Sequence, residues 1–156
     1  MTIRFAVTSD IPAMVKLSEA QRIIDAQQQP MLWRKAKDSA THQMSYYEQF
    51  MAEDHIIMQV SQAGTGINGF IIAMMQIPPK IYDLPGYTCI INEFIVKQDA
   101  LWQSVGRELL QATITEAKSL KAVQLVVVSN THNQHKQRLL KSFNLDVASQ
   151  WHTKAL

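Results

Sequence analysis

The chain has few of the residues that would suit it to an oxidising compartment, a nucleic acid or a membrane. Only one of its 156 residues is a cysteine, Cys89, which excludes an internal disulfide framework and fits a reducing compartment. The formal net charge is +2, and no run of lysine or arginine favours nucleic-acid binding. No apolar stretch reaches the roughly 18 residues that a membrane span needs, and the N-terminus has no signal-peptide core. We therefore expect a cytoplasmic protein with no nucleic-acid or membrane partner.

What the sequence does contain is the composition of an ordinary globular domain. Hydrophobic residues make up 47% of the chain and charged residues 18%, as in soluble proteins. A chain of this length can bury a core of its own, so we predict a single domain over residues 1–156. Cys89 lies in an apolar strand, where a buried and unreactive thiol is favoured over a nucleophile.

Hydrophobic periodicity predicts an alternation of strands and helices. The predicted strands are residues 3–7, 55–61, 67–76, 90–96, 121–129 and 145–151. The predicted helices are residues 11–26, 38–53, 104–120 and 134–143. The order β-α-α-β-β-β-α-β-α-β, with an early hairpin and a late crossover, indicates a mixed α/β sheet covered by helices. The length of strand 67–76 suggests a central place, and the valine-rich run 123–128 is typical of a parallel strand covered on both faces.

The stretch from Ile90 to Leu110 is where we expect function. Its apolar strand leads through a polar break into a helix that Ser104 and Gly106 are predicted to open. The first N–H groups of a helix lack internal partners, and the helix dipole adds partial positive charge there. A phosphate group is a natural ligand for such a place. The alternative is a capped helix without a ligand, since strand–turn–helix units are common.

Four segments, taken in order, resemble the GNAT (Gcn5-related) N-acetyltransferases over nearly the whole chain. They are T-I-R-F-A-V-T-S-D-I-P-A-M-V-K-L at the start, V-S-Q-A-G-T-G-I-N-G-F-I-I-A, I-N-E-F-I-V, and N-Q-H-K-Q-R-L-L-K-S-F-N-L, which is similar to the family's late helix N-x-x-A-x-x-x-Y-x-x-x-G-F. The resemblance implies an α/β (α+β) fold with a mixed, mostly antiparallel twisted sheet flanked by helices. It also implies transfer of an acyl group from acetyl-CoA, as co-substrate, to a small-molecule or peptide amine.

The sequence departs from the family pattern at the residues that carry chemistry. The family's pyrophosphate loop, Q/R-x-x-G-x-G/A, falls on residues 101–106, where Gly106 is kept but Leu101 and Ser104 replace the leading Gln/Arg and the first glycine. The late-helix tyrosine, which protonates the leaving thiolate in members that use it, falls on Leu140. These departures leave a second interpretation open, a degenerate acyl-CoA-binding or interaction protein without catalysis.

The resemblance implies a cofactor site in which backbone N–H groups hold the pyrophosphate and the fourth strand pairs with the pantetheine arm. Its predicted residues are Phe94, Ile95, Val96, Leu101, Trp102, Gln103, Ser104, Val105, Gly106, Arg107 and Asn133. The functional role expected of Ser104 is a hydroxyl that donates a hydrogen bond to phosphate. For Arg107 a solvated helix residue is the alternative to a charge partner.

The chemistry also needs a group that removes a proton from the incoming amine. Glu93 is the best candidate, because an apolar strand disfavours the charged form of a carboxylate, as a working base requires. The alternative is a structural ion pair with a basic residue. Asn92 is expected on the opposite face, where it would orient substrate, and Trp33 and Tyr82 are expected to wall the acceptor site. The histidines show no metal-ligand spacing, so we expect no metal, and an exposed sheet edge would allow a homodimer.

Overall fold

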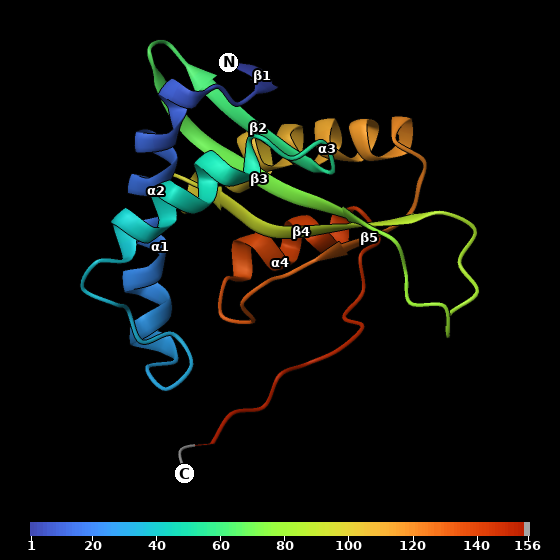
Figure 1. The fold of residues 1–156 in the computed structure, drawn as a ribbon. Coiled ribbons are helices and arrows are strands. Elements are labelled where there is room, and N and C mark those ends of the chain that lie inside the picture. Colours follow the sequence, from blue (N-terminus) through green and yellow to red (C-terminus); the bar gives the residue numbers. More distant parts are fainter. Residues whose placement is uncertain (155–156) are drawn as a thin grey trace.

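Residues 1–154 are described by a computed structural model in which one five-stranded sheet separates two pairs of helices (Figure 1). The strands are β1 (Thr2–Phe5), β2 (Ile56–Ala63), β3 (Gly66–Gln76), β4 (Tyr87–Val96) and β5 (Ala122–Val127). The α-helices are α1 (Ile11–Gln28), α2 (Ser39–Phe50), α3 (Arg107–Ser119) and α4 (Gln134–Ser142). Short helical turns cover Thr8–Asp10, Asp99–Leu101 and Trp102–Gly106. No helix within this range combines the length and apolarity of a membrane span.

The sheet follows the order of the chain, β1-β2-β3-β4-β5. The first three pairings are antiparallel and only β5 runs parallel to its neighbour β4. This confirms the predicted α+β class, the mostly antiparallel sheet and the central place of β3. The β2–β3 hairpin turns at Gly64, whose φ of 59° is open to glycine and costly for other residues.

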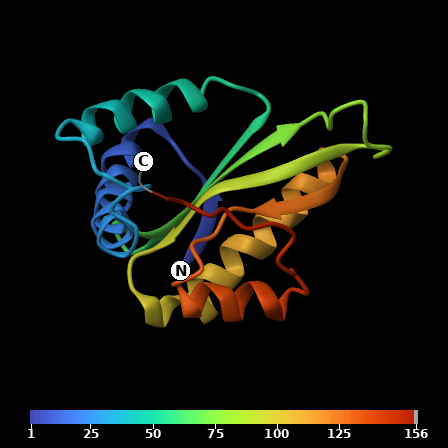
Figure 2. The same ribbon diagram turned by 90° about the horizontal axis from the view of Figure 1, so that it is seen from below.

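Two hydrophobic cores lie on the two faces of the sheet, because alternate strand residues point to opposite sides. Helices α1 and α2 cover one face and α3 and α4 the other (Figure 2). The first core is built around Met14, Tyr47, Val60 and Phe70, all with no exposed surface. The second core is built around Ile71, Ile91, Leu109, Leu110 and Leu139, which are equally buried. Each such side chain contributes about 1.5–3 kcal/mol relative to an exposed one.

An ion pair fixes the entry to α1. Arg4 donates to both carboxylate oxygens of Asp10, at 2.6 and 2.8 Å, and the N–H of Val7 donates to the same carboxylate at 2.9 Å. The hydrogen bond from Arg4 is the main reason that the pKa of Asp10 lies below its ordinary value. Asp10 makes no side-chain cap hydrogen bond to α1, so its carboxylate ties the helix entry to β1.

Two predictions about the C-terminal part of the chain are wrong. Strand β5 lies at the edge of the sheet and exposes 51% of Val123 and 38% of Val126, so it is not covered on both faces. The predicted strand at residues 145–151 is absent, since residues 144–154 form neither helix nor strand. Val147 and Trp151 are 69% and 78% exposed there. Apolar alternation favours a strand only where a neighbouring strand and a covering layer receive it, and this segment has neither.

Candidate active site

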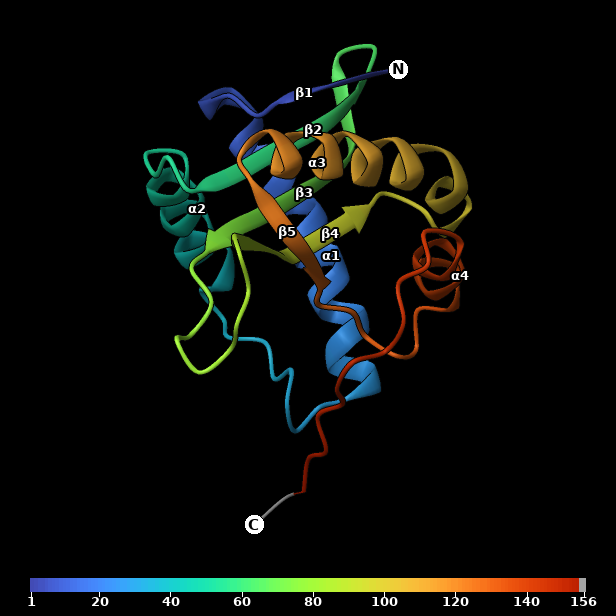
Figure 3. The same ribbon diagram turned by 90° about the vertical axis from the view of Figure 1, so that its right-hand side faces the viewer.

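Strands β4 and β5 run side by side over only half the length of β4. Their pairing ends at Ile91, whose carbonyl accepts a hydrogen bond from the N–H of Val128 at 2.9 Å. Beyond this point β4 continues to Val96 with β3 as its only partner strand, while the chain after β5 turns away toward α4 (Figure 3). β5 therefore leaves the edge of β4 unpaired beside Phe94–Val96, and this space between the diverging strands is called the gap below.

A β-bulge in β4 decides which way its side chains point at this gap. The pairing with β3 skips Asn92, which is the surplus residue. Ile91 and Phe94 consequently share the core of α3 and α4, although they are three residues apart. Ile95 packs in the other core, and Glu93 faces the same side, toward α1 and α2. In an unbroken strand Glu93 would share the face of Ile91, because side chains alternate.

Glu93 is held by three neutral donors from the two covering helices. Its Oε2 accepts hydrogen bonds from the Tyr47 hydroxyl at 2.5 Å and the Ser18 hydroxyl at 3.0 Å. Its Oε1 accepts one from the Gln43 amide at 2.8 Å. In the described residues Glu93 forms no salt bridge, so the structural ion pair considered above is not found. A carboxylate offers about four acceptor positions, which leaves room for a further donor.

Tyr47 acts in this network as a donor that does not ionise. Burial raises the pKa of its hydroxyl, and the charge of Glu93 raises it further. Its ring has no exposed surface and lies edge-on to Phe70, with the centroids 6.0 Å apart. Ser18 is 2.6 Å from the same hydroxyl and is also buried. The carboxylate of Glu93 is thus oriented by a rigid and uncharged support.

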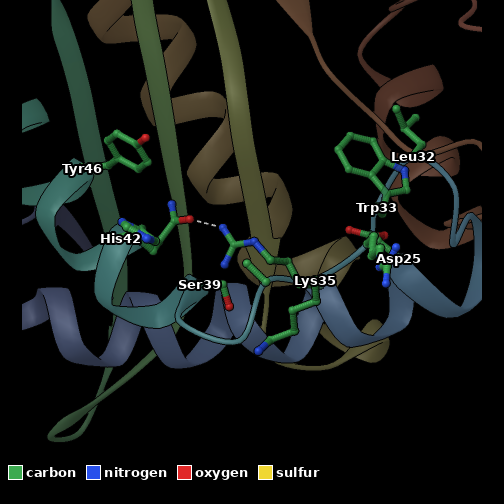
Figure 4. Close-up of a pocket in the computed structure, with 11 residues that line it drawn as sticks. Asp25, Leu32, Trp33, Lys35, Ser39, His42 and Tyr46 are labelled. Atoms are coloured by element: carbon green, nitrogen blue, oxygen red, sulfur yellow. Dashed lines mark hydrogen bonds between the residues drawn. The ribbon is translucent and has the colours of Figure 1, made fainter.

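A cleft of about 430 Å³ opens next to this network, between α1, α2 and the loop that joins them. Figure 4 shows Leu32 and Trp33 at one end, His42 and Tyr46 at the other, and Lys35 between them. The remaining lining residues are Arg22, Asp25, Arg34, Ala36, Ser39 and Gln43.

Gln43 connects this cleft with the carboxylate. It lines the cleft, donates to Glu93, and accepts from Arg22, which also donates to Glu19 at 2.8 Å. Lys35 forms a salt bridge with Glu19 at 2.8 Å on the same wall. Hydrogen bonds from Lys35, Ser39 and Arg22 outweigh the effect of burial and hold the pKa of Glu19 below its ordinary value. An acceptor in the cleft would therefore meet charged, ordered side chains beside an aromatic wall.

The two side chains predicted to wall the acceptor site do not lie together. Trp33 lines the cleft and is 41% exposed. Tyr82 is 62% exposed in the loop between β3 and β4, which projects from the opposite end of the sheet from α1 and α2 (Figure 1). Asn92 is exposed at the bulge. The structure thus places Trp33 next to the Glu93 network but not Tyr82.

The helix after β4 begins earlier than the sequence analysis predicts. A helical run starts at Asp99 with a 3₁₀ turn, continues through a π turn, and becomes α3 at Arg107. Ser104 and Gly106 lie inside this run and do not open it, so that prediction is wrong. Gln98, with extended backbone angles, is the residue that precedes the first turn. The N–H groups without helical partners therefore belong to the first turn at Asp99, whose own carboxylate sits there.

Gly106 is explained by packing within the chain. Its φ of −60° is that of any helical residue, but a Cβ would lie 3.0 Å from the Trp102 ring and 3.1 Å from Leu139. Trp102 is 2% exposed and lies edge-on to Phe94, with the ring centroids 4.9 Å apart. The glycine that the family pattern keeps therefore makes room for an indole in this chain.

The remaining residues predicted for the cofactor divide into a buried and an exposed group. Ile95, Val96 and Val105 are buried, Leu101 is partly buried, and Gln103, Ser104 and Arg107 are exposed. Arg107 lies over the Phe143 ring, 5.3 Å from its centroid, and donates to the Ser142 hydroxyl at 3.0 Å.

Asn133 serves as the N-cap of α4. Its side-chain oxygen accepts the N–H of Lys136 at 2.9 Å. Such a cap satisfies one of the free donors of the first helical turn. The side-chain oxygen of Asn133 is thereby committed to the helix.

Lys136 is the residue of this region that the sequence analysis missed. Its ammonium lies in the gap, where it donates to the carbonyls of Phe94 at 3.3 Å and Val128 at 3.1 Å. Only 7% of the residue is exposed, and burial lowers the pKa of the ammonium to about 8, against the opposing charges of Asp25 and Glu93. A signal was available, because Lys136 stands where the late-helix pattern has alanine.

The gap between the diverging strands is thus occupied from within. Lys136 bridges the strand ends, and its ammonium lies 5.6 Å from the centre of the Trp102 ring and 5.3 Å from that of Phe94. Among the described residues no three metal-ligating side chains gather. What the site offers is an oriented carboxylate on one side of β4 and a buried amine on the other.

Comparison with known proteins rests on structure, since no family model and no curated protein sequence matches the chain. A mutant of the BH1408 protein from Bacillus halodurans superposes with a TM-score of 0.87 and 15% identity, over 100% of this chain and 99% of that one. A predicted acetyltransferase from Clostridium acetobutylicum, solved with acetyl-CoA, gives 0.75 and 15%, over 99% and 95%. The chain has the GNAT fold.

A third solved structure extends the GNAT likeness to an aminoglycoside 6'-N-acetyltransferase from Acinetobacter haemolyticus. It has a TM-score of 0.73 and 11% identity, over 100% of this chain and 99% of that one. At identities this low, the superpositions establish the GNAT fold alone. A fold has an activity only where a site supports it. The activity must therefore be argued from the residues around Glu93.

Proposed function

We propose that the chain is an acetyl-CoA-dependent N-acyltransferase for a small-molecule or peptide amine. The observation that carries this proposal is the bulge at Asn92, which turns Glu93 toward the α1–α2 cleft just after β4 and β5 part. A carboxylate joined to a cleft by Gln43, beside a strand edge that β5 does not pair, is what direct transfer needs. The acetyl-CoA bound by the Clostridium acetobutylicum structure with the same fold supports the choice of donor.

In this mechanism the acceptor amine lies in the cleft that Trp33 and Gln43 line. Glu93 accepts its proton, directly or through a water, while Tyr47 and Ser18 keep the carboxylate in place. The nitrogen lone pair attacks the thioester carbon, the C–S bond breaks, and CoA leaves as a thiolate. Holding the amine beside the base supplies much of the rate, because orientation replaces a bimolecular encounter.

The CoA side of the site is proposed to use the backbone of Phe94–Val96 and the surface of residues 101–107, with Asn133 at its border. The exposed Arg107 supplies a positive charge that suits a pyrophosphate there, and the N–H groups without helical partners lie next to it, in the first turn at Asp99. Ser104 offers a hydroxyl, which at present donates to the Leu101 carbonyl at 3.4 Å. Asn92 is exposed and remains our candidate for orienting substrate.

The side chains that fill the gap between β4 and β5 favour a second candidate function. Lys136 and Trp102 occupy the place that the thioester arm would enter, and Leu140 offers no proton to a leaving thiolate. A relative that binds CoA without turnover, or one that serves only in interactions, would tolerate both features. In either case a cytoplasmic location, a homodimer and the absence of a metal remain predictions.

Two measurements separate these functions. The thermal midpoint should rise with acetyl-CoA, because a ligand that binds only the folded state stabilises it by mass action. Thiol release across an amine panel should follow, and Glu93→Gln should slow it on the order of 100-fold, with exposed Glu108→Gln as the matched control. A raised midpoint without thiol release points to the binding protein, and no change in either measurement points to an interaction protein.

A further inference from the structure

Lys136 is a buried amine whose charge has no carboxylate partner at hydrogen-bond distance. Among residues 1–154 its ammonium forms no salt bridge and relies on the carbonyls of Phe94 and Val128. Burying a charge without a partner is costly, so the position is not explained by stability. A lysine with a perturbed pKa, held at the edge of the strand proposed to bind the donor, is a candidate for chemistry.

The position of the amine matches the place where a thioester would lie. The carbonyl of Phe94 faces the gap between β4 and β5, since it accepts from Lys136 at 3.3 Å. An acyl-CoA arm laid along Phe94–Val96, as in the proposed function, would run past this carbonyl. Its thioester carbon would then lie within reach of a nitrogen that hydrogen-bonds to the same strand edge.

From this geometry we propose that Lys136 is an acyl acceptor, and that the chain transfers the acyl group of a bound thioester to its own Lys136 Nζ. The lone pair of Nζ forms a bond to the thioester carbon and the C–S bond breaks. CoA leaves as a thiolate, which takes up the proton that Nζ loses. The product is a stable amide, so the transfer happens once per chain. The inference rests on the proposed function for its donor.

The environment of Lys136 supplies the neutral amine that such an attack needs. Burial lowers the pKa of the ammonium to about 8, with Asp25 on α1 and Glu93 on β4 opposing the shift. Close to that pH a large fraction of the amine is unprotonated, whereas an unperturbed lysine is almost fully charged. The rings of Phe94 and Trp102 lie over the same ammonium, with centroids 5.3 and 5.6 Å away.

The test is site-resolved mass spectrometry of the intact wild-type chain after incubation with acetyl-CoA near pH 8. One acetyl group should appear on Lys136 roughly tenfold faster or more than on exposed Lys141 of the same helix, reflecting the larger neutral fraction. The preference should vanish in urea. Lys136→Arg should remove this acetyl group, and Lys141→Arg should leave it. Equal labelling of the two lysines in the folded chain would overturn the proposal, whether or not the variants fold.

A second acyl donor separates this inference from the proposed function. The acetyl thioester of N-acetylcysteamine carries the reactive bond without a nucleotide. Selective labelling of Lys136 by this small thioester, with no labelling or thermal shift from acetyl-CoA, would uphold the reactive lysine and overturn the CoA-dependent function. Thiol release with amines and a thermal shift, with Lys136 unlabelled by either donor, would overturn the inference and leave the function standing.

Discussion

The hydroxyl of Tyr47 lies 2.5 Å from Oε2 of Glu93, and it joins α2 to the bulged strand. Ser18 of α1 contacts both groups, at 2.6 and 3.0 Å. Three elements that are distant in sequence therefore meet at one carboxylate. Support of this kind is what keeps a catalytic group in a productive orientation.

Replacing Tyr47 by Phe should weaken both the fold and the site. The change removes a buried donor and leaves its partners with unmet hydrogen bonds, which costs about 1–3 kcal/mol. Urea unfolding measures this loss. The neighbouring Tyr46→Phe is the matched control, because Tyr46 is 55% exposed and its change should stay within roughly 0.5 kcal/mol. Equal losses in the two variants would contradict the role given to Tyr47.

Replacing Gly106 by Ala should destabilise the chain by about 1–3 kcal/mol, as overpacking does. The added Cβ would press on Trp102 and Leu139 at 3.0 and 3.1 Å. The comparison variant is Gly66→Ala, where the nearest atom lies 3.9 Å away. If Gly106→Ala lowered CoA affinity without any loss in unfolding free energy, the packing explanation would be wrong.

The buried ammonium of Lys136 should make stability depend on pH. Its folded pKa of about 8 lies below the ordinary 10.5, so the unfolded chain binds more protons between these values and stability rises with pH there. Relative to Lys136→Met, the wild-type free energy of unfolding should increase by roughly 2–3 kcal/mol from pH 7 to pH 10. Denaturant unfolding of both proteins at several pH values measures the difference, and a flat difference would show that Lys136 is not buried as a cation.

The acceptor site should respond to Trp33 and not to Tyr82. With an amine that the panel identifies as substrate, Trp33→Ala should raise KM several-fold at little cost in stability, since it removes an aromatic wall from the cleft. Tyr82→Ala is the control, as its side chain projects from the loop between β3 and β4. Steady-state kinetics of the two variants decides, and a larger effect from Tyr82 would place the acceptor elsewhere.

The sequence predicted the elements of this fold better than it predicted their surroundings. Periodicity located the helices of residues 11–28 and 134–142 within about two residues. It could not reveal that β5 lies at the edge, because an apolar run looks the same whether or not a further layer covers it. The prediction of a strand at residues 145–151 failed for a similar reason, since an alternating sequence does not provide a partner strand.

The candidate site was predictable in part. Glu93 could be predicted as the base because it is the one carboxylate in an apolar strand. Its donors Ser18 and Gln43 come from helices that only the tertiary fold brings to it. Gly106 was singled out as part of a pyrophosphate loop, but in the structure its missing side chain makes room for the Trp102 ring, which no spacing rule indicates. Lys136 stood in the sequence at an alanine position, and its burial could be known only from the way α4 packs against the gap.

The surplus residue at Asn92 has a consequence for how this chain can change over time. Each point substitution near Asn92 would change a single side chain around the carboxylate. Loss of the codon for Asn92 would leave Glu93 opposite Ile72 and still facing α1 and α2. One codon added to β3 opposite Asn92 would instead restore regular pairing and turn Glu93 toward the core beneath α3. The length of β3 opposite Asn92, more than the identity of Asn92 itself, is therefore what lineages descending from this sequence have to preserve.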